Sequence, residues 1–340
     1  MSEGEGQGER KPRVFSGMQP SGEAHLGNYL GALRQWVDMQ NEYDCFFCVV
    51  DDHAITGEFA GEALPTRTFE LAVSFLAVGL DPSRSTIFVQ SDVPEHTELS
   101  WLFNAVTPVG DLERMTQYKD KTARLSSIPV GLLNYPVLQA ADILIYRAEL
   151  VPVGEDQIQH LELAREIARR WNARFGDVFP EPRALVSGSG RILGLDGSAK
   201  MSKSLGNTVS ILAEPDEIRE RVRTAVTDPQ RVRRTDPGRP DFCNVYTLHE
   251  HLTDPALLPD IAEQCRTAQR GCVECKGILA DAIIERFAPF RERARHYREN
   301  PEEVVAILDD GAERARSLAR ETMAEVRARM GLDWRKGLSR

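Results

Sequence analysis

The sequence predicts an α/β protein in which a doubly wound parallel sheet is followed by a helical domain. Over residues 13–207, short apolar runs typical of strands alternate with stretches of helical spacing, the order that builds a parallel sheet. From about Pro215 onward, nearly every segment instead has the period of a helix with a polar, arginine-rich face. We therefore place a domain boundary near residue 207 and expect ligands at the carboxyl ends of the strands.

Three runs predict the first strands of this sheet. Residues 13–18 and 86–90 have strand character, and residues 45–50 form the continuous apolar run of a strand buried on both faces. The stretches between these runs carry apolar stripes at helical spacing, namely Leu26, Leu30, Leu33 and Val37 in the first and Phe69, Val73 and Leu76 in the second. Further along, we expect helices over residues 136–146 and 156–174 and short strands over residues 150–153 and 184–186.

The composition argues against membrane-spanning and secreted proteins. The most apolar stretch, Leu71 to Leu80, is too short to span a bilayer, and the Gly/Glu-rich N-terminus has no apolar segment of a secretory signal. The formal net charge of -10 gives no global basic field for nucleic acid, although a local basic stripe would suffice. We expect a cytoplasmic protein without membrane contact.

The motif PSGEAHLGN, residues 20–28, stands where the first strand passes into the first helix. Gly22 and Gly27 allow a tight turn and a close approach of the backbone, and the helix N-terminus offers free N–H groups to an anion. His25 and Asn28 lie one helical turn apart, so both can donate to phosphate oxygens. On these residues alone, a phosphate site and a surface turn with a polar cap stay open as alternatives.

The motif GSAKMSKSLGN, residues 197–207, forms a loop that begins and nearly ends in glycine. Lys200 and Lys203 can meet negative charge that develops on a polyphosphate, and Ser202 can hydrogen-bond to it. The alternative is a solvated basic loop. The pairing of this loop after the last strand with HLGN after the first strand favours the phosphate site.

With both motifs in place, the chain resembles the class I aminoacyl-tRNA synthetases. HLGN is similar to their HIGH motif, and KMSKS matches their second signature in every letter. Five further segments resemble the bacterial tryptophanyl-tRNA synthetases, and the similarity runs from about Arg13 to the end: GMQPSG, FFCVVDDHAIT, LERMTQYKDK, LLNYPVLQAADILIY and VPVGEDQIQHLELAREIARRWNARFG. The resemblance implies a Rossmann-type catalytic domain, the use of ATP with Mg²⁺, and the ligation of L-tryptophan to tRNA(Trp).

The implied reaction has two steps. The carboxylate of tryptophan attacks the α-phosphate of ATP, which gives tryptophanyl-adenylate and pyrophosphate, and tryptophan then passes to the terminal ribose of the tRNA. Positioning and charge stabilisation dominate such phosphate chemistry. By resemblance, the residues that act on the phosphates are His25, Asn28, Lys121, Lys200 and Lys203, and those that hold ATP are Gln19, Gly27, Asp156, Ile192, Met201 and Ser202.

The resemblance makes Asp142 the residue that reads the indole ring. If residues 135–142 are helical, Tyr135, Gln139 and Asp142 share one face. A carboxylate at the end of an apolar slot would accept the single N–H of indole, and phenylalanine would leave it unpaired. Sequence alone favours a buried carboxylate in a helix cap or an ion pair. The other positions that match the tryptophan site are Phe15, Gly17, Val50, His53, Tyr135, Gln139, Ile143, Val151, Val153 and Gln157.

Two positions depart from the family pattern. Gln139 stands where a methionine is often found, which puts fine specificity toward substituted tryptophans in doubt. Leu205 and Gly206 follow KMSKS in place of an Asp-Pro pair, which would make the loop more mobile.

The six cysteines fall into two groups. Cys45 and Cys48 lie on the buried strand and look like small core residues. Cys243, Cys265, Cys272 and Cys275 have the spacing C-x21-C-x6-C-x2-C in the helical domain, and such thiols can hold zinc or an iron–sulfur cluster. Some bacterial tryptophanyl synthetases carry a 4Fe–4S cluster on a similar pattern. Reduced buried cysteines, or one incidental disulfide, remain the alternative.

The resemblance also implies partners and an organisation. We expect a disordered tail over residues 1–12, the catalytic domain over 13–207, an anticodon-binding helical domain over 208–300, and a C-terminal helix within 301–340 that packs back on the catalytic domain. A symmetric homodimer is implied, with each tRNA bridging both subunits. Candidate basic contacts to tRNA are Arg231, Arg233, Arg234, Arg335, Lys336 and Arg340. The alternatives are a tyrosyl enzyme, a small-molecule adenylyltransferase, and an auxiliary paralogue that binds tryptophan but serves as a partner or regulatory protein.

Overall fold

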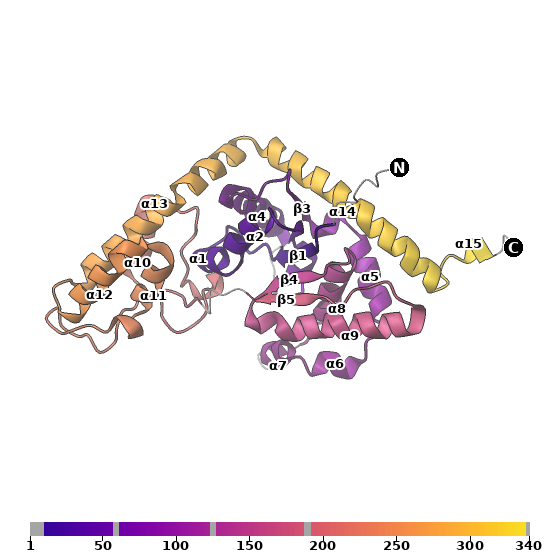
Figure 1. Ribbon diagram of the computed structural model, residues 1–340, viewed down its shortest axis with the longest axis horizontal. Helices are drawn as coiled ribbons and strands as arrows, with labels where there is room; N and C mark the ends of the chain where they lie inside the picture. The colour runs from indigo at the N-terminus through magenta and orange to yellow at the C-terminus, as the bar shows by residue number, and fades with distance from the viewer. Residues whose placement is uncertain (1–9, 57–60, 123–126, 187–191, 338–340) are drawn as a thin grey trace, which may run out of the picture.

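A five-stranded parallel sheet lies at the centre of the computed structural model, which describes residues 10–56, 61–122, 127–186 and 192–337. Helices cover both faces of the sheet, and a helical region lies beside it (Figure 1). The strands are β1 (Arg13–Met18), β2 (Asp44–Val49), β3 (Ser85–Val89), β4 (Leu150–Val153) and β5 (Arg183–Val186). Each end lies within one residue of the predicted end, and the predicted fold class is confirmed.

The helices of the sheet domain connect these strands. β1 is followed by α1 (Leu26–Asn28), a π-helical turn (Tyr29–Leu33) and α2 (Arg34–Met39), and β2 is followed by α3 (Asp51–Ala54) and α4 (Leu64–Val78). Between β3 and β4 lie α5 (Glu95–Phe103), α6 (Val109–Glu113), α7 (Thr116–Thr122) and α8 (Val130–Leu144), and β4 is followed by α9 (Ile158–Phe175). Short 3₁₀ turns cover Gly61–Ala63, Gln90–Asp92, Glu155–Gln157 and Lys203–Leu205.

The strand order β3-β2-β1-β4-β5 places a switch point between β1 and β4. The chain moves outward from β1 through β2 to β3, and then crosses back to β4 on the other side of β1. The register of β1 with β4 is the single pair Val14 and Leu150, and Pro152 has no N–H with which to extend the ladder. The carboxyl ends of these two strands are the place where sheets of this type bind ligands.

The sheet separates two hydrophobic cores, and β2 contributes to both. Cys45 belongs to the core beneath α1, α2 and α4, whereas Cys48 belongs to the opposite core beneath α5, α8 and α9. Both side chains are fully buried, which confirms that these cysteines are core residues.

Two helices differ from the predicted pattern. The π turn adds a residue before α2 and rotates the face that follows, so Trp36 and Met39 are buried and Val37 is only partly buried. The predicted stripe is confirmed for Leu26, Leu30 and Leu33, and Val37 at its end is partly buried against the same core. α8 begins at Val130 rather than at residue 136, and it continues through Pro136, whose missing N–H costs one helical hydrogen bond.

The helical region shares a core with the sheet. Its apolar side chains, from Ile218 to Leu279, join the core beneath α4. The ring of Tyr29 contacts Phe287 edge to face at 5.2 Å where the two parts meet. The region contains α10 (Pro215–Arg223), α11 (Asn244–Leu252), α12 (Leu258–Arg266) and α13 (Cys272–Glu299), with 3₁₀ turns at Pro240–Phe242 and Pro255–Leu257.

Two long helices join the halves of the molecule. α13 and α14 (Pro301–Arg329) form an arch, with α13 along the helical region and α14 along the sheet, and α15 (Trp334–Gly337) extends beyond it (Figure 1). α14 packs on the edge strand β3 and so covers a strand edge that would otherwise be open. Gly311 allows this contact, because a Cβ at this position would lie 1.8 Å from the carbonyl oxygen of Ile87.

The N-terminal segment contacts the sheet domain earlier than predicted. Arg10 pairs with Glu149 at 2.9 Å, and the Pro12 carbonyl accepts from the N–H of Asp44 at 3.1 Å. The prediction of a disordered tail is therefore wrong for residues 10–12, and residues 1–9 lie outside the described part of the chain.

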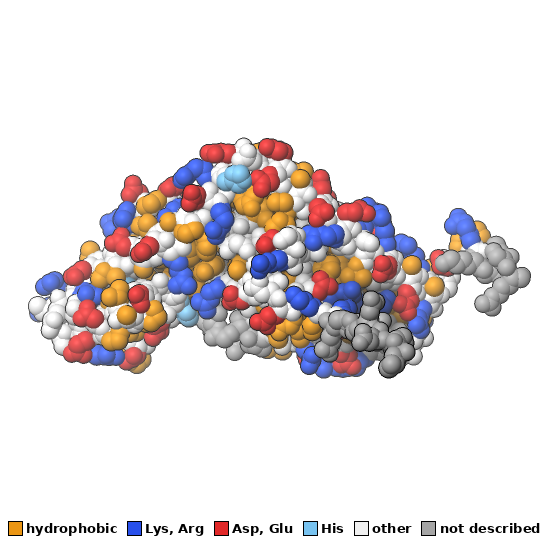
Figure 2. Space-filling view, turned by 45° about the horizontal axis from the view of Figure 1, so that its top comes forward, with side chains coloured by type: hydrophobic (Ala, Val, Ile, Leu, Met, Phe, Trp, Pro, Cys, Tyr) orange, Lys and Arg blue, Asp and Glu red, His pale blue; other side chains and the backbone are white. Residues whose placement is uncertain are grey.

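The surface carries both signs of charge. Figure 2 shows acidic and basic side chains interspersed over one face, without a broad field of one sign on that face. Over the described residues, no helix combines the length and the apolar character that a membrane span requires.

Replacing Gly311 with alanine should destabilise the protein, because the added methyl group would collide with the backbone of β3. We expect urea denaturation to show a loss of about 1–3 kcal/mol in the free energy of unfolding, as overpacking usually causes. Gly277→Ala on α13 is the matched control, since nothing lies within 4 Å of a Cβ at that position. The control should gain roughly 0.5–1 kcal/mol from helix propensity. Equal stability of the two variants would contradict this role of Gly311.

Candidate active site

The two sequence motifs meet beside the carboxyl end of β1. The chain that leaves the KMSKS loop pairs with the first motif, since the N–H of Leu26 donates to the carbonyl of Val209 at 2.8 Å. Gly27 lies beneath Met201, and a Cβ at residue 27 would be 3.0 Å from the Met201 Cβ. The glycine in HLGN therefore permits the two motifs to approach closely, as the sequence predicts.

The polar side chains of HLGN cap their own helix. Nδ1 of His25 accepts from the backbone N–H of Asn28 at 3.3 Å, and the Asn28 side chain accepts from the backbone N–H of His25 at 3.0 Å. Burial, followed by the charges of Lys203 and Lys200, lowers the pKa of His25 to about 4. The imidazole is therefore neutral at pH 7. Because Nδ1 accepts, the proton lies on Nε2, which is the ring nitrogen able to donate to a ligand.

A buried amide shapes the loop that carries KMSKS. The side-chain oxygen of Asn207 accepts from the backbone N–H of Ser202 at 2.8 Å. Its amide donates to Asp196 at 3.0 Å and to the Lys200 carbonyl at 3.4 Å. The Asn207 carbonyl also accepts from the N–H of Leu195 at 2.9 Å. Asn207 thus closes the loop on itself and fixes the base from which the two lysines extend.

Lys200 and Lys203 extend toward the other predicted phosphate-site residues. Nζ of Lys203 donates to the carbonyl of Ser21 at 3.0 Å, in the turn before HLGN, and Lys200 pairs with Asp156 at 3.6 Å. Lys203 keeps access to solvent, yet partial desolvation lowers its pKa to about 8, against the opposing effect of Glu23. Two cationic groups thus lie against residues that follow β1 and β4, and an anion can replace their present partners.

A hollow of about 330 Å³ opens beside Lys203, within the size range of ligand pockets. One of its walls is fixed by Glu23, which accepts from the Ser210 hydroxyl at 2.6 Å and pairs with Arg298 of α13 at 2.7 Å. Its lining combines residues of the first motif, of the loop and of α10: Glu23, His25, Lys203, Thr208, Ser210, Glu217 and Arg221.

Asp142 is an ionised carboxylate in the opposite core. It lies on α8 and is 1% exposed. Oδ2 is 2.7 Å from Nε2 of His53, while Oδ1 is 2.6 Å from Nδ1 of His96 and 2.7 Å from Nε2 of Gln90. Burial raises the pKa of Asp142, but the charge and hydrogen bond of His53 and the hydrogen bond of His96 outweigh burial and lower it to about 2. Both an ion pair and a pocket acceptor, the two sequence alternatives, are compatible with this geometry.

The apolar residues predicted for the amino-acid pocket belong to the core that surrounds Asp142. Gly17 lies on β1 where a Cβ would be 2.6 Å from Cγ1 of Val50, so glycine lets β1 pass close to β2 at this point. The buried members of the same core are Phe15, Val50, Ile143, Val151 and Val153.

The polar residues predicted for the same pocket are linked across α8 and α9. The hydroxyl of Tyr135 hydrogen-bonds to Nε2 of His160 at 2.9 Å and donates to Gln117 at 3.2 Å, and burial raises the pKa of Tyr135 to about 12. Gln139 donates to Gln157 at 3.4 Å. The glutamine that departs from the family pattern therefore contacts another predicted site residue.

Three predicted residues have less definite positions. The amide of Gln19 lies 3.5 Å from the carbonyl of His53, just after β1. Ile192 is buried in the core that also contains Leu26, Met201 and Val209. The backbone of Lys121 lies in α7, but its side chain is outside the described residues.

The four cysteines of the helical region lie near one another without the arrangement of a metal site. Burial, followed by Cys243, Cys265 and Cys272, raises the pKa of Cys275 to about 12, and its Sγ lies 3.4 Å from Nε2 of His249. In the described part of the chain, no three His, Cys, Asp or Glu side chains form a group that could hold a metal ion. The predicted zinc or 4Fe–4S site is therefore not supported, and none of the described cysteines forms a disulfide.

The basic residues predicted for tRNA differ in their surroundings. Arg231 is a local support, since it donates to the carbonyls of Arg234 and Arg270 at 3.0 and 2.8 Å. Arg233 is exposed, and Arg335 lies 4.6 Å above the ring of Trp334. Arg340 and the side chain of Lys336 lie outside the described residues.

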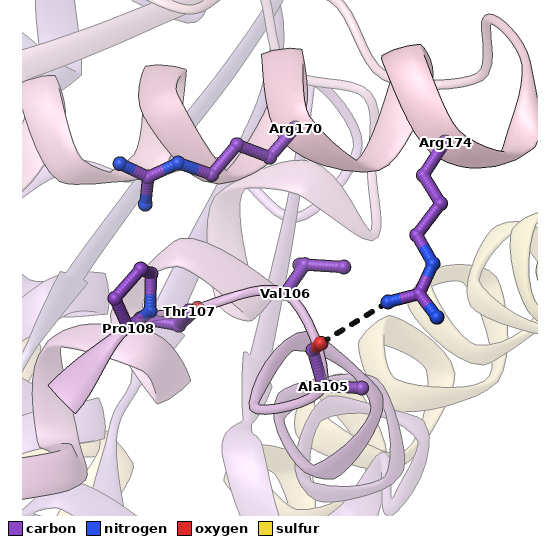
Figure 3. A pocket seen from close by; sticks show the side chains of 6 residues that line it. All are labelled: Ala105, Val106, Thr107, Pro108, Arg170 and Arg174. Atoms are coloured by element: carbon purple, nitrogen blue, oxygen red, sulfur yellow. Dashed lines mark hydrogen bonds between the residues drawn. The ribbon is translucent and has the colours of Figure 1, made fainter.

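A larger hollow, of about 400 Å³, is lined by none of the predicted site residues. Figure 3 shows its floor at Ala105 to Pro108, after α5, and two arginines that reach over it from α9. Arg174 donates to the Ala105 carbonyl at 3.5 Å, and Arg170 pairs with Asp111 at 2.6 Å. Both charges already have partners, so size alone does not make this hollow the active site.

Sequence reasoning missed three buried polar side chains near Asp142. Gln90 and His96 contact its carboxylate directly, and the hydroxyl of Tyr146 lies 2.6 Å from Nε2 of His96. Gln90 and His96 are 52 and 46 residues away from Asp142 along the chain, so no local spacing links them. The one available signal is that Gln90 is a polar residue directly after a buried strand.

Comparison with known proteins relates this geometry to a family. The family of tRNA synthetases class I (W and Y) matches residues 7–288. The tryptophan–tRNA ligase of Deinococcus radiodurans is 52% identical, covering 94% of this chain and 98% of its own length, and that of Gloeobacter violaceus is 46% identical, covering 94% and 96%. The crystal structure of Campylobacter jejuni tryptophanyl-tRNA synthetase with ADP and tryptophan has a TM-score of 0.86 at 38% identity, covering 94% of this chain and 99% of that one. Archaeoglobus fulgidus tyrosyl-tRNA synthetase, at 23% identity, 84% and 90% coverage and a TM-score of 0.66, shares the fold.

Affinity for a nucleoside triphosphate should fall as the pH rises through 8. The pKa of Lys203 in the free protein is lowered to about 8, so its positive charge is present at pH 7 and largely lost at pH 9. Linkage then predicts that the dissociation constant, measured by calorimetry, is about tenfold larger at pH 9 than at pH 7. Lys203→Arg keeps the charge at both pH values and should remove this dependence. An equal loss in the arginine variant would assign the effect to another group.

Proposed function

The chain belongs to the class I tRNA synthetases for tryptophan and tyrosine, and on this premise we infer that it is a tryptophan–tRNA ligase. Such an enzyme uses ATP to activate L-tryptophan and then joins it to tRNA(Trp). The observation within the structure that best supports tryptophan as the substrate is the ionised, fully buried carboxylate of Asp142 among apolar residues. A carboxylate among apolar residues forms a hydrogen bond with a ring that has one N–H donor. With a ring that has no donor, the same acceptor position stays unpaired, which disfavours binding.

We propose that the two KMSKS lysines act on the triphosphate. Attack of the tryptophan carboxylate on the α-phosphorus forms the adenylate and releases pyrophosphate, which carries the negative charge away. Lys200 and Lys203 would offset that charge, and neutral His25 would donate through Nε2. The partners that the lysines have in this structure, Asp156 and the Ser21 carbonyl, support this role, because they follow β4 and β1 in the chain and can be exchanged for phosphate oxygens.

Asp156 is proposed to bind the ribose hydroxyls of ATP. Its pKa is lowered, since the charge of Lys200 and the hydrogen bonds of Gln157 and Lys200 outweigh burial. The carboxylate is therefore ionised and can accept hydrogen bonds from two hydroxyl groups. Mg²⁺ enters as part of the substrate, held by the phosphates of ATP as is usual for this ion.

The helical region and the C-terminal helix are proposed to bind and support the tRNA. Exposed Arg233 and Arg234 lie in the loop before α11 and can contact phosphates, whereas base contacts would read the anticodon. The reaction on tRNA makes the cytoplasm the expected compartment.

The amino-acid requirement is tested by exchange of labelled pyrophosphate into ATP. We expect exchange with tryptophan and not with tyrosine. Asp142→Ala should lower kcat/KM for tryptophan by about 100-fold, because a charge-assisted buried hydrogen bond contributes about 1.5–3 kcal/mol. Asp228→Ala is the matched control: it removes another buried carboxylate of low pKa, paired with Arg239, outside the described pocket. The control should lose stability but keep its preference for tryptophan.

Two results of this assay would contradict the proposal. Exchange with tyrosine at a comparable rate would favour a tyrosyl enzyme. Absence of exchange with either amino acid would favour an auxiliary paralogue that binds tryptophan without activating it.

We also propose that the protein is a homodimer. Trp101 on α5, Val109 on α6 and Val130 at the start of α8 are 75%, 58% and 78% exposed, and α5 and α6 both pack on α8. Large exposed apolar side chains on adjoining helices are typical of an association surface. Trp101→Glu should shift the molar mass from light scattering toward that of one chain, whereas Trp334→Glu, at a tryptophan that is 60% exposed on α15, should not. A wild-type mass of one chain would contradict the dimer.

A further inference from the structure

Three side chains outside the predicted site form a hydrogen-bonded chain that ends on Asp142. Gln90 follows β3, His96 lies in the first turn of α5, and Tyr146 follows α8, so three separate elements converge. All three side chains are 0% exposed. The Tyr146 hydroxyl is 2.6 Å from Nε2 of His96, and Nδ1 of His96 is 2.6 Å from Oδ1 of Asp142. Gln90 Nε2 reaches the same oxygen at 2.7 Å.

The ionised carboxylate sets the direction of the bonds that it receives. A carboxylate accepts hydrogen bonds and cannot donate them, so the His96 proton on the Asp142 side must lie on Nδ1. The other ring nitrogen, Nε2, is hydrogen-bonded to the hydroxyl of Tyr146. Aromatic rings keep water away from the chain, because Phe46 and Phe15 stack on Tyr146 at 4.7 and 5.7 Å.

The number of donors leaves one place for a ligand. A carboxylate offers about four acceptor positions, two on each oxygen. Gln90 and His96 use those of Oδ1, and His53 uses one of Oδ2 at 2.7 Å. The remaining acceptor position, on Oδ2, can take one further N–H donor. A group with two donors, one for each oxygen, would find no free position on Oδ1.

The orientation of Gln90 argues against a purely structural cluster. Among the described residues, its Oε1 has no hydrogen-bond partner although the side chain is fully buried. Leaving a buried carbonyl unpaired costs about 1–3 kcal/mol. The amide nevertheless turns its N–H group toward Asp142, which fixes the carboxylate at the expense of stability.

We propose that Gln90, His96 and Tyr146 are positioning residues for amino-acid selection, which occupy Oδ1 of Asp142 and leave one acceptor position of Oδ2 for the ring N–H of the substrate. The proposal rests on the proposed function, since it assigns the selectivity of the tryptophan pocket to residues that do not touch the substrate. Their contribution is the direction and the ionised state of the acceptor.

The test compares two substrates that differ in this N–H. β-(3-Benzothienyl)-L-alanine has sulfur where tryptophan has its ring N–H. For each enzyme, kcat/KM in pyrophosphate exchange is measured with both amino acids. Tyr146→Phe keeps the stacked ring but removes the hydroxyl that holds His96. We expect it to lower the preference for tryptophan by about tenfold, the effect of losing roughly 1.4 kcal/mol of selective binding. KM for tryptophan should rise while KM for ATP stays unchanged.

A second variant and a control separate positioning from folding. Gln90→Met keeps the length of the side chain but removes the amide donor, and it should also narrow the preference. Tyr246→Phe is the control, because it removes a hydroxyl that donates to the Leu258 carbonyl at 3.4 Å in the helical region. It should leave the preference unchanged. If thermal melting shows that Tyr146→Phe does not fold, the substrate preference of Gln90→Met alone tests the proposal.

The outcomes are distinct. A preference equal to that of the wild type in both Tyr146→Phe and Gln90→Met, whatever their melting temperatures, would overturn the proposal and make the cluster structural. A narrowed preference in either folded variant supports it. Absence of tryptophan-dependent exchange in the wild type would instead refute the proposed function.

Discussion

The burial of one ionised carboxylate sets the requirements for the sheet's second core. Moving a carboxylate out of water costs several kcal/mol unless donors surround it, and Asp142 receives donors from three elements that are distant in sequence. α3, the turn after β3 and α5 must therefore all reach the same point on α8. Aromatic packing around Tyr146 then excludes water, which strengthens the same hydrogen bonds. The same cluster also fixes how α5 and α8 lie relative to each other, because His96 of α5 bonds to Asp142 of α8.

The phosphate side of the site depends on contacts of a different kind. Backbone pairing brings the KMSKS loop onto the first motif, and Asn207 fixes the loop with one buried amide. Glu23 then connects this side to the arch, because it pairs with Arg298 at the end of α13, which also binds Glu70 of α4 at 2.6 Å. A movement of α13 relative to the sheet would strain this contact at the edge of the hollow. Glu23 is thus one of the contacts that join the helical region to this side of the sheet, together with Arg221 of α10, which donates to the Thr208 carbonyl at 2.9 Å.

The arch also completes the sheet. α14 covers the edge strand β3, and Gly311 permits an approach that any side chain would prevent. Arg327 of α14 forms an ion pair with Glu98 of α5, and Arg316 pairs with Glu95 at 3.2 Å. The same helix therefore supports the strand that precedes Gln90 and the helix that carries His96. The C-terminal helix α14 therefore holds in place two of the elements that surround Asp142.

The sequence by itself determined the five strands, the doubly wound order and the two phosphate motifs, because period-two and continuous apolar runs, glycines and paired lysines are local signals. It also determined that Tyr135, Gln139 and Asp142 share a face, since helical spacing alone decides this. Tertiary structure decided the rest. After the π turn, α2 buries Trp36 fully and Val37 only in part. The cysteines of the helical region are not arranged as a metal site among the described residues. The donors to Asp142 were also invisible, because burial of a charge recruits whatever polar groups the fold brings within about 3 Å, irrespective of their distance along the chain.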